Sequence, residues 1–125
     1  MYHLLLVENE DSLKNWYVHE LKEEGYEITT VSNGHEALGK LKEGSFDAVI
    51  LDIKMPGMDG LEFLEKFLGE KRKIPVIINT AYPRYKHNFM SWAAEAYVVK
   101  SSKLDELKKT IEEVIEKYQK EKKCG

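Results

Sequence analysis

The sequence predicts a single α/β domain built on a five-stranded parallel sheet with helices on both faces. Four short apolar runs support this prediction, because they lack the polar alternation of a strand with one solvated face. The runs occupy residues 4–7, 48–51, 76–78 and 96–99. Segments with helical spacing of apolar residues separate them, and such alternation is typical of parallel sheets with right-handed crossovers. At 125 residues the chain is long enough for one domain and too short for two.

The first half of the chain is predicted to contain three strands and two helices. After the strand at 4–7, Asp11 and Ser12 are good N-caps for a helix that ends at Gly25. A strand at 26–31 follows, and the residues Ser-Asn-Gly at 32–34 predict a turn. A short helix then runs to Gly44, and the third strand is expected at 46–51.

The second half repeats the alternation. A loop at 55–60 offers Asp59 as the cap of a helix that Gly69 closes. The fourth strand is expected at 74–79, with Pro75 tolerated at its start. Pro83 is suited to the first turn of a helix that runs to about residue 93. A strand at 97–99 and a long helix at 104–118 complete the pattern. Periodicity alone leaves the order of the strands open.

Composition excludes several classes of protein. A net charge of −3 gives no reason to expect nucleic-acid binding. No apolar run is long enough to span a membrane, and the amino terminus lacks the pattern of a signal segment. The single cysteine, Cys124, cannot form an internal disulfide, which predicts a reducing, cytoplasmic location.

Each apolar run ends in a polar residue that phosphate chemistry could use. These residues are Glu8, Asn9, Asp52, Thr80 and Lys100. Ligands of open α/β sheets bind at the carboxyl ends of the strands, so we expect all five residues at one edge. Carboxylate and amide oxygens suit Mg²⁺, while a hydroxyl and a lysine suit a phosphoryl group. The alternative for each residue is structural: a loop cap at Asp52, a solvated acid at Glu8, a strand end at Thr80, an ordinary ion pair at Lys100.

The chain resembles the receiver domain of two-component response regulators over essentially its whole length. The matching stretches are residues 5–10, 49–60, 79–81 and 96–100. The resemblance implies a flavodoxin-like (βα)5 fold, with residues 1–120 as the receiver domain and 121–125 as a carboxyl-terminal tail.

The resemblance also implies a role for each site residue. Asp52 matches the phosphoacceptor, and Thr80 and Lys100 match the groups that bind the phosphoryl oxygens. Tyr97 matches the aromatic switch residue. Glu8, Asn9, Asp52 and the backbone carbonyl of Lys54 match the pocket for Mg²⁺ or Mn²⁺.

The implied partners are a histidine kinase or phosphotransfer protein as phosphodonor, and a downstream protein that binds the face of the fourth helix, fifth strand and fifth helix. We expect a stand-alone monomer that signals by protein contact or as a phosphorelay intermediate, with dimerisation on phosphorylation left open. A regulator cut from a longer chain would look the same.

Two residues depart from the family's pattern. Asn9 stands where the family usually has a metal-binding Asp, and its uncharged amide predicts weaker Mg²⁺ affinity and slower phosphorylation. Ser101 follows Lys100 where the family normally has a cis-joined Pro. A cis bond costs roughly 2.5–4 kcal/mol before a non-proline residue, against about 0.5–1 kcal/mol before proline, so we expect a trans bond and a shifted loop.

Two other hypotheses remain. The chain could be a degenerate receiver that binds partners without phosphorylation, although the intact Asp52, Thr80 and Lys100 argue against this. An aspartyl-phosphate phosphatase would need an Asp where this chain has Lys54. We therefore expect a signalling domain that catalyses its own phosphorylation and dephosphorylation, not a turnover enzyme.

Overall fold

The computed structural model describes residues 1–52, 66, 74–81, 95–100 and 103–124. In chain order the elements are β1 (His3–Val7), α1 (Asp11–Glu23), β2 (Glu27–Val31), α2 (Gly34–Glu43), β3 (Ala48–Leu51), β4 (Val76–Thr80), β5 (Ala96–Val99) and α5 (Asp105–Cys124). The five strands confirm the predicted alternation. The predicted loop at 55–60, both helices expected between β3 and β5, Lys54 and the Lys100–Ser101 bond lie outside the described residues.

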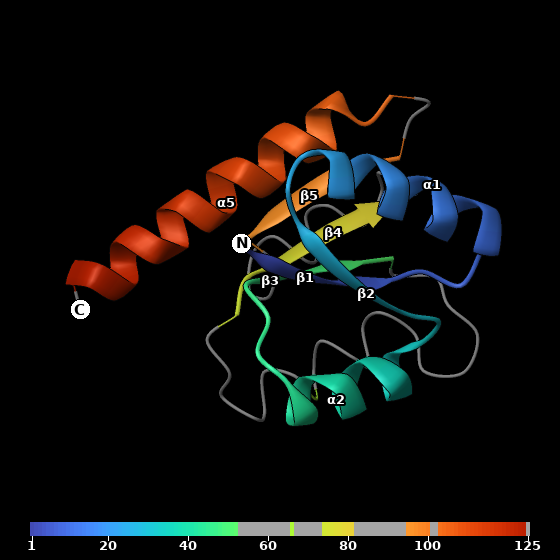
Figure 1. Cartoon of the computed structure of the whole chain (residues 1–125), viewed down its shortest axis with the longest axis horizontal. Helices are drawn as coiled ribbons and strands as arrows, with labels where there is room; N and C mark the ends of the chain where they lie inside the picture. The colour runs from blue at the N-terminus through green and yellow to red at the C-terminus, as the bar shows by residue number, and fades with distance from the viewer. Residues whose placement is uncertain (53–65, 67–73, 82–94, 101–102, 125) are drawn as a thin grey trace.

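All five strands pair in parallel, in the order β2-β1-β3-β4-β5 (Figure 1). This is the flavodoxin-like order that the resemblance implied. β1 is central, because it pairs with both β2 and β3, and Val7 lies opposite Leu51 in the register. The carboxyl ends of β1 and β3 are therefore neighbours.

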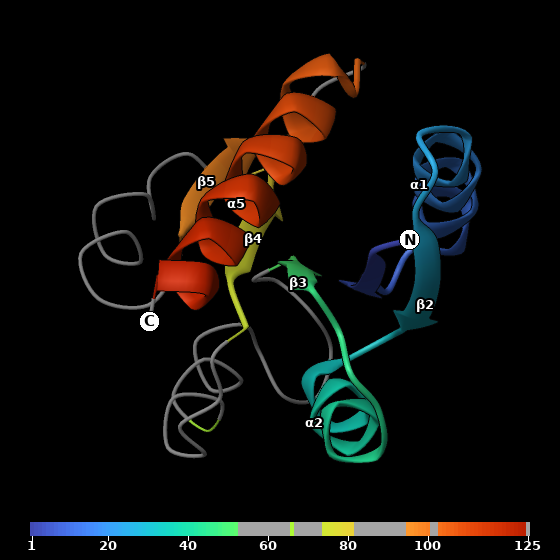
Figure 2. The ribbon, with the colours of Figure 1, turned by 60° about the vertical axis from the view of Figure 1, so that its left-hand side comes forward.

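The sheet is buried on both faces. One face packs against α1 and α5, through residues such as Leu6, Ile50 and Ile111, and the other packs against α2 (Figure 2). Successive strand residues alternate between these two cores, which favours apolar side chains at consecutive positions. This double burial explains why the strands read as continuous apolar runs.

The helix ends correct two local predictions. The N-cap of α1 is Glu10 and not Asp11 or Ser12, and its side chain makes no capping hydrogen bond. The Ser12 hydroxyl instead donates to the Glu10 carboxylate at 3.1 Å, while Asp11 lies in the first turn, where a negative charge favours the helix dipole. Gly34, which we expected in a turn, is the first residue of α2, and the Asn33 side chain accepts a hydrogen bond from the Glu36 amide.

Two further boundaries differ from the expected ones. β4 includes Thr80, which we expected just after the strand, because its carbonyl accepts a hydrogen bond from the Lys100 amide at 2.7 Å. α5 continues to Cys124, past residue 118, where we expected the last helix to end. As expected, Gly25 follows α1 with a φ of 95°, a backbone conformation that glycine adopts without steric cost.

Candidate functional site

The carboxyl edge of the sheet brings together three charged residues from distant parts of the chain. Glu8 and Asp52 directly follow the paired residues at the ends of β1 and β3, and the Asp52 amide donates to the Val7 carbonyl at 3.2 Å. Lys100 follows β5 and reaches both carboxylates. Its Nζ lies 2.7 Å from Oε1 of Glu8 and 3.0 Å from Oδ2 of Asp52. The sequence prediction that these residues converge is confirmed.

The three side chains are largely withdrawn from water. Glu8 is 2% exposed and Asp52 is 8% exposed, while Lys100 is partly buried. Two carboxylates side by side repel each other, and burial increases that repulsion. The Lys100 ammonium balances only one of the two negative charges. The edge therefore retains a negative charge and closely spaced oxygens, which are the properties a divalent cation requires of its ligands.

Lys100 remains a cation well above neutral pH. Burial alone lowers the pKa of a lysine, but the hydrogen bonds and negative charges of Glu8 and Asp52 outweigh that effect. The net result is a pKa raised above the ordinary value of a lysine. The ammonium is therefore available to pair with an anion throughout the physiological range.

Tyr17 and Asn79 form a second polar pair that the sequence analysis did not assign to the site. Tyr17, on α1, is 1% exposed, and the side chain of Asn79, which is 3% exposed, lies close enough to its hydroxyl to influence its pKa. Burial raises the pKa of Tyr17; the Asn79 side chain and the Lys100 charge oppose this in part. The available signal was Asn79, a polar residue that directly follows the apolar run at 76–78.

The raised pKa values of Lys100 and Tyr17 predict a loss of stability in alkali. A group with a raised pKa in the folded state contributes stability that is complete below its unfolded pKa, about 10 for both side chains. That contribution disappears as the pH rises through the folded pKa. We expect the free energy of unfolding, measured by urea titration, to fall steadily above about pH 10. The fall should be shallower in Tyr17→Phe, and an identical slope in that variant would contradict the assignment for Tyr17.

Thr80 and Tyr97 occupy the opposite face of the sheet from Asn79. Thr80 follows Ile78 by two residues on β4, and Ile78 pairs with Tyr97 on β5. Both side chains are buried, Thr80 completely and Tyr97 to 9% exposure. They therefore lie on the same face of neighbouring strands, two register positions apart. Asn9 is exposed beside Glu8.

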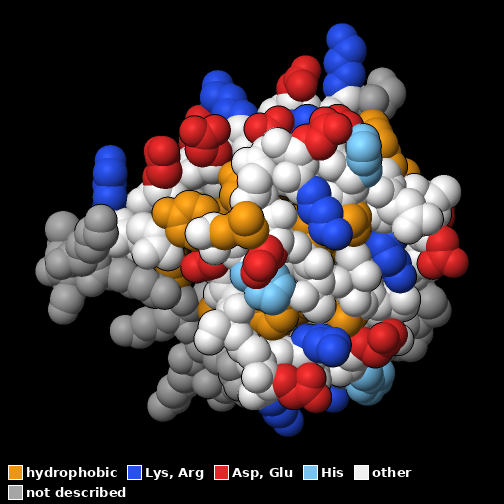
Figure 3. Space-filling model, in the orientation of Figure 1, with side chains coloured by type: hydrophobic (Ala, Val, Ile, Leu, Met, Phe, Trp, Pro, Cys, Tyr) orange, Lys and Arg blue, Asp and Glu red, His pale blue; other side chains and the backbone are white. Residues whose placement is uncertain are grey.

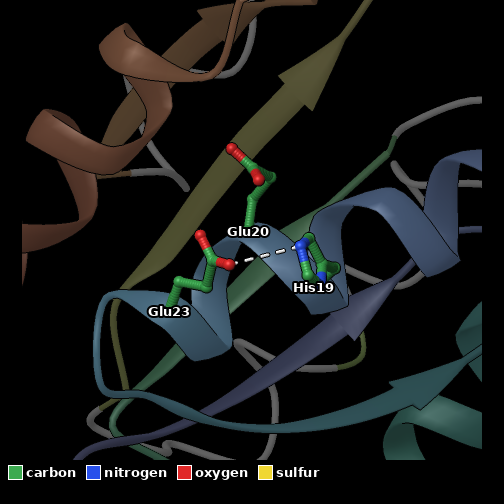
Figure 4. A group of neighbouring side chains, drawn as sticks. All are labelled: His19, Glu20 and Glu23. Atoms are coloured by element: carbon green, nitrogen blue, oxygen red, sulfur yellow. Dashed lines mark ion pairs between the residues drawn. The ribbon is translucent and has the colours of Figure 1, made fainter.

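A second group of possible ligands lies on the outer side of α1, far along the helix from Asp11. Ligand atoms of His19, Glu20 and Glu23 lie within 4.8 Å of one another (Figure 4). His19 and Glu23 are mostly exposed and 3.3 Å apart, whereas Glu20 is held by Lys108 of α5 at 3.2 Å. Lys108 also contacts Glu24 at 3.3 Å. One contact within α1 and one ion pair between α1 and α5 account for this group.

The surface carries side chains of both charges. On the face seen in Figure 3, acidic and basic side chains are interspersed and do not form a basic stripe. Within the described part of the chain, no helix combines the length and the apolar character needed to cross a membrane.

The sequence matches the response regulator receiver domain family over residues 4–112. YkoG, a transcriptional regulatory protein of Bacillus subtilis, is 36% identical over 107 residues, which cover 84% of this chain and 47% of that protein. VanRB, a regulatory protein of Enterococcus faecalis, is 35% identical over 114 residues, 90% of this chain and 51% of that protein. The chain thus spans about half the length of these curated relatives.

Solved structures show the same relationship. The response regulator TrrA from Thermotoga maritima, in complex with Mg²⁺ and BeF, is 45% identical with a TM-score of 0.85 and covers 90% of this chain and 98% of its own. A second TrrA structure, in complex with the histidine kinase ThkA, has a TM-score of 0.83, with 90% of this chain and 97% of that chain covered. A CheY-like receiver domain protein from Methanospirillum hungatei is 27% identical, with a TM-score of 0.89 and coverage of 97% and 98%.

Proposed function

The chain belongs to the family of response regulator receiver domains, and on this premise we propose that it accepts a phosphoryl group on Asp52 in two-component signalling. The observation that supports this most is the Lys100 ammonium, which bridges Asp52 and Glu8 at the carboxyl edge of the sheet. Asp52 is thereby fixed in orientation, next to a cation that can pair with the incoming group. A carboxylate used only as a loop cap would not require this buried partner.

The donor set fits a divalent ion, Mg²⁺ or Mn²⁺. Glu8 and Asp52 supply adjacent buried carboxylate oxygens, and Asn9 lies next to them with a neutral amide oxygen. These are hard oxygen ligands, which Mg²⁺ binds together with water and phosphate oxygens. When bound, the ion neutralises charge on the phosphoryl oxygens. The Mg²⁺ in the TrrA structure is consistent with this assignment.

The proposed chemistry needs few protein groups. A carboxylate oxygen of Asp52 forms a bond to phosphorus while the bond from phosphorus to the donor nitrogen or oxygen breaks, and the leaving group carries away that electron pair. Lys100 and Thr80 then bind the phosphoryl oxygens by charge and hydrogen bonding. The added charge, about −1.5 to −2, draws Thr80 toward it, and Tyr97 on the same face of the sheet responds.

The partners follow from the family. We propose a histidine kinase or a phosphotransfer protein as phosphodonor, for which the TrrA–ThkA complex is a precedent. A downstream protein would bind the face that includes β5 and α5. The phosphorylation would occur in the cytoplasm. In this role the chain is a signalling domain and not a turnover enzyme.

The test is intact mass spectrometry after incubation with a small phosphodonor such as acetyl phosphate. With Mg²⁺ we expect one phosphoryl adduct on the wild-type chain, and with a chelator in place of Mg²⁺ we expect none. Failure to form the adduct at any Mg²⁺ concentration would favour a receiver that binds its partners without phosphorylation.

Asn9→Asp is expected to bind Mg²⁺ about tenfold more tightly than the wild type and to be phosphorylated faster. The substitution adds a charge to an exposed side chain next to Glu8, and a unit charge a few ångströms from the ion contributes on the order of 1 kcal/mol in a solvated site. Calorimetric titration with Mg²⁺ measures this directly. Equal Kd values in the two proteins would show that residue 9 is not a ligand.

A further inference from the structure

We infer that Tyr17 is a positioning residue for phosphoryl transfer, acting through Asn79 on the groups around Asp52. The inference rests on the proposed function and extends it to two residues to which the family resemblance assigns no role. It derives from where this polar pair lies and from which charges surround it.

The sheet register places Asn79 beside the phosphoacceptor. Leu51 of β3 pairs with Ile78 of β4, so the next step along the two strands sets Asp52 alongside Asn79. Alternation along β4 turns Ile77 and Asn79 toward the core that contains α1 and α5, opposite to Thr80. Glu8, Asp52 and Lys100 have the same parity as Leu6, Ile50 and Val98, which belong to that core. Asn79 therefore shares a face with the three charged residues.

Tyr17 extends this arrangement from the helix. Its ring packs in the same core, and its hydroxyl lies close enough to the Asn79 side chain for the two to interact. The charges of Lys100, Glu8 and Asp52 all act on this hydroxyl. Tyr17 and Asn79 are thus buried polar residues next to the charged ones, at positions where simple packing would favour apolar side chains. A buried phenol and amide are costly unless they satisfy each other or a neighbour.

Tyr17 and Asn79 gain a role when Asp52 is phosphorylated. In the structure, the Lys100 ammonium is balanced by both carboxylates. In the proposed phosphorylated state, Asp52 carries the phosphoryl group, Glu8 would help to hold the metal, and Lys100 would pair with the phosphoryl oxygens. The dipoles of Tyr17 and Asn79 then stabilise the partly buried ammonium without competing for the metal.

The test compares Tyr17→Phe with Tyr26→Phe as the matched control. Tyr26 is also a half-buried tyrosine, but it lies just before β2, at the opposite end of the sheet from Asp52. We expect Tyr17→Phe to lower the phosphorylation rate at saturating acetyl phosphate about tenfold, the effect of losing one polar interaction in a charged site. The Mg²⁺ Kd should change less than twofold, since Tyr17 is not a ligand. Tyr26→Phe should match the wild type in both measurements.

A purely structural role would lower the melting temperature of Tyr17→Phe and leave the rate of the folded protein unchanged. Asn79→Ser provides a second route, because it interrupts the same pair at its other end. The double variant should be no slower than the slower single variant if the two residues act as one unit. Additive losses in the double variant, or a Tyr17→Phe rate equal to that of the wild type, would overturn the inference. Absence of adduct on the wild type and Tyr26→Phe would instead refute the proposed function, and this inference with it.

Discussion

Asp52→Asn is expected to abolish phosphoryl uptake, so that intact mass spectrometry shows only unmodified protein under conditions that fully modify the wild type. The amide lacks the nucleophilic carboxylate oxygen, and no amount of donor compensates for this. The variant retains the size and much of the hydrogen bonding of the native residue. Its folded structure should therefore survive, and the loss reports chemistry.

The matched control is Asp47→Asn, the same substitution just before the other end of β3. Asp47 accepts a hydrogen bond from the His3 amide at 2.8 Å and lies across the sheet from the Asp52 edge. We expect normal phosphoryl uptake in this variant, with at most a modest loss of stability. Uptake by Asp52→Asn equal to that of Asp47→Asn would mean that another residue is the acceptor.

Lys100→Met is expected to lower the free energy of unfolding by about 3 kcal/mol in the absence of Mg²⁺. The substitution retains the length and apolar character of the side chain but leaves two buried carboxylates without their cation, and such a loss typically costs 3–5 kcal/mol. Mg²⁺ should restore much of this stability, because it supplies the missing charge to Glu8 and Asp52. Urea unfolding with and without Mg²⁺ measures both effects.

Calorimetry measures independently whether Lys100 and Mg²⁺ compete for the same carboxylate oxygens. The wild-type ammonium occupies oxygens that a metal ion would ligate, so Lys100→Met should bind Mg²⁺ more tightly than the wild type. The control is Lys108→Met, which removes a lysine that also contacts two glutamates but lies nearer the surface. This control should lose little stability, because its ion pairs lie at the surface, and should gain no more from Mg²⁺ than the wild type does. Equal Mg²⁺ affinity in Lys100→Met and the wild type would contradict the competition.

Some local predictions were wrong because alternatives of similar energy compete at helix ends. Asp11 and Ser12 both have suitable capping side chains, yet the backbone enters α1 at Glu10. Gly34 was predicted in a turn, although Asn33 caps a helix that begins at that glycine. A single hydrogen bond decides such boundaries, and sequence patterns do not resolve differences of that size.

The sequence by itself determined the five strands, the described helices between them, and the charged residues that end β1, β3 and β5. This was possible because strands covered on both faces must be apolar at consecutive positions, so the first polar residue marks the sheet edge. The tertiary structure alone decided the strand order, the Lys100 contact with Glu8 across 92 residues of chain, and the pairing of Tyr17 with Asn79. Those contacts depend on which strands become neighbours and which helix covers them, and short-range sequence patterns do not determine either.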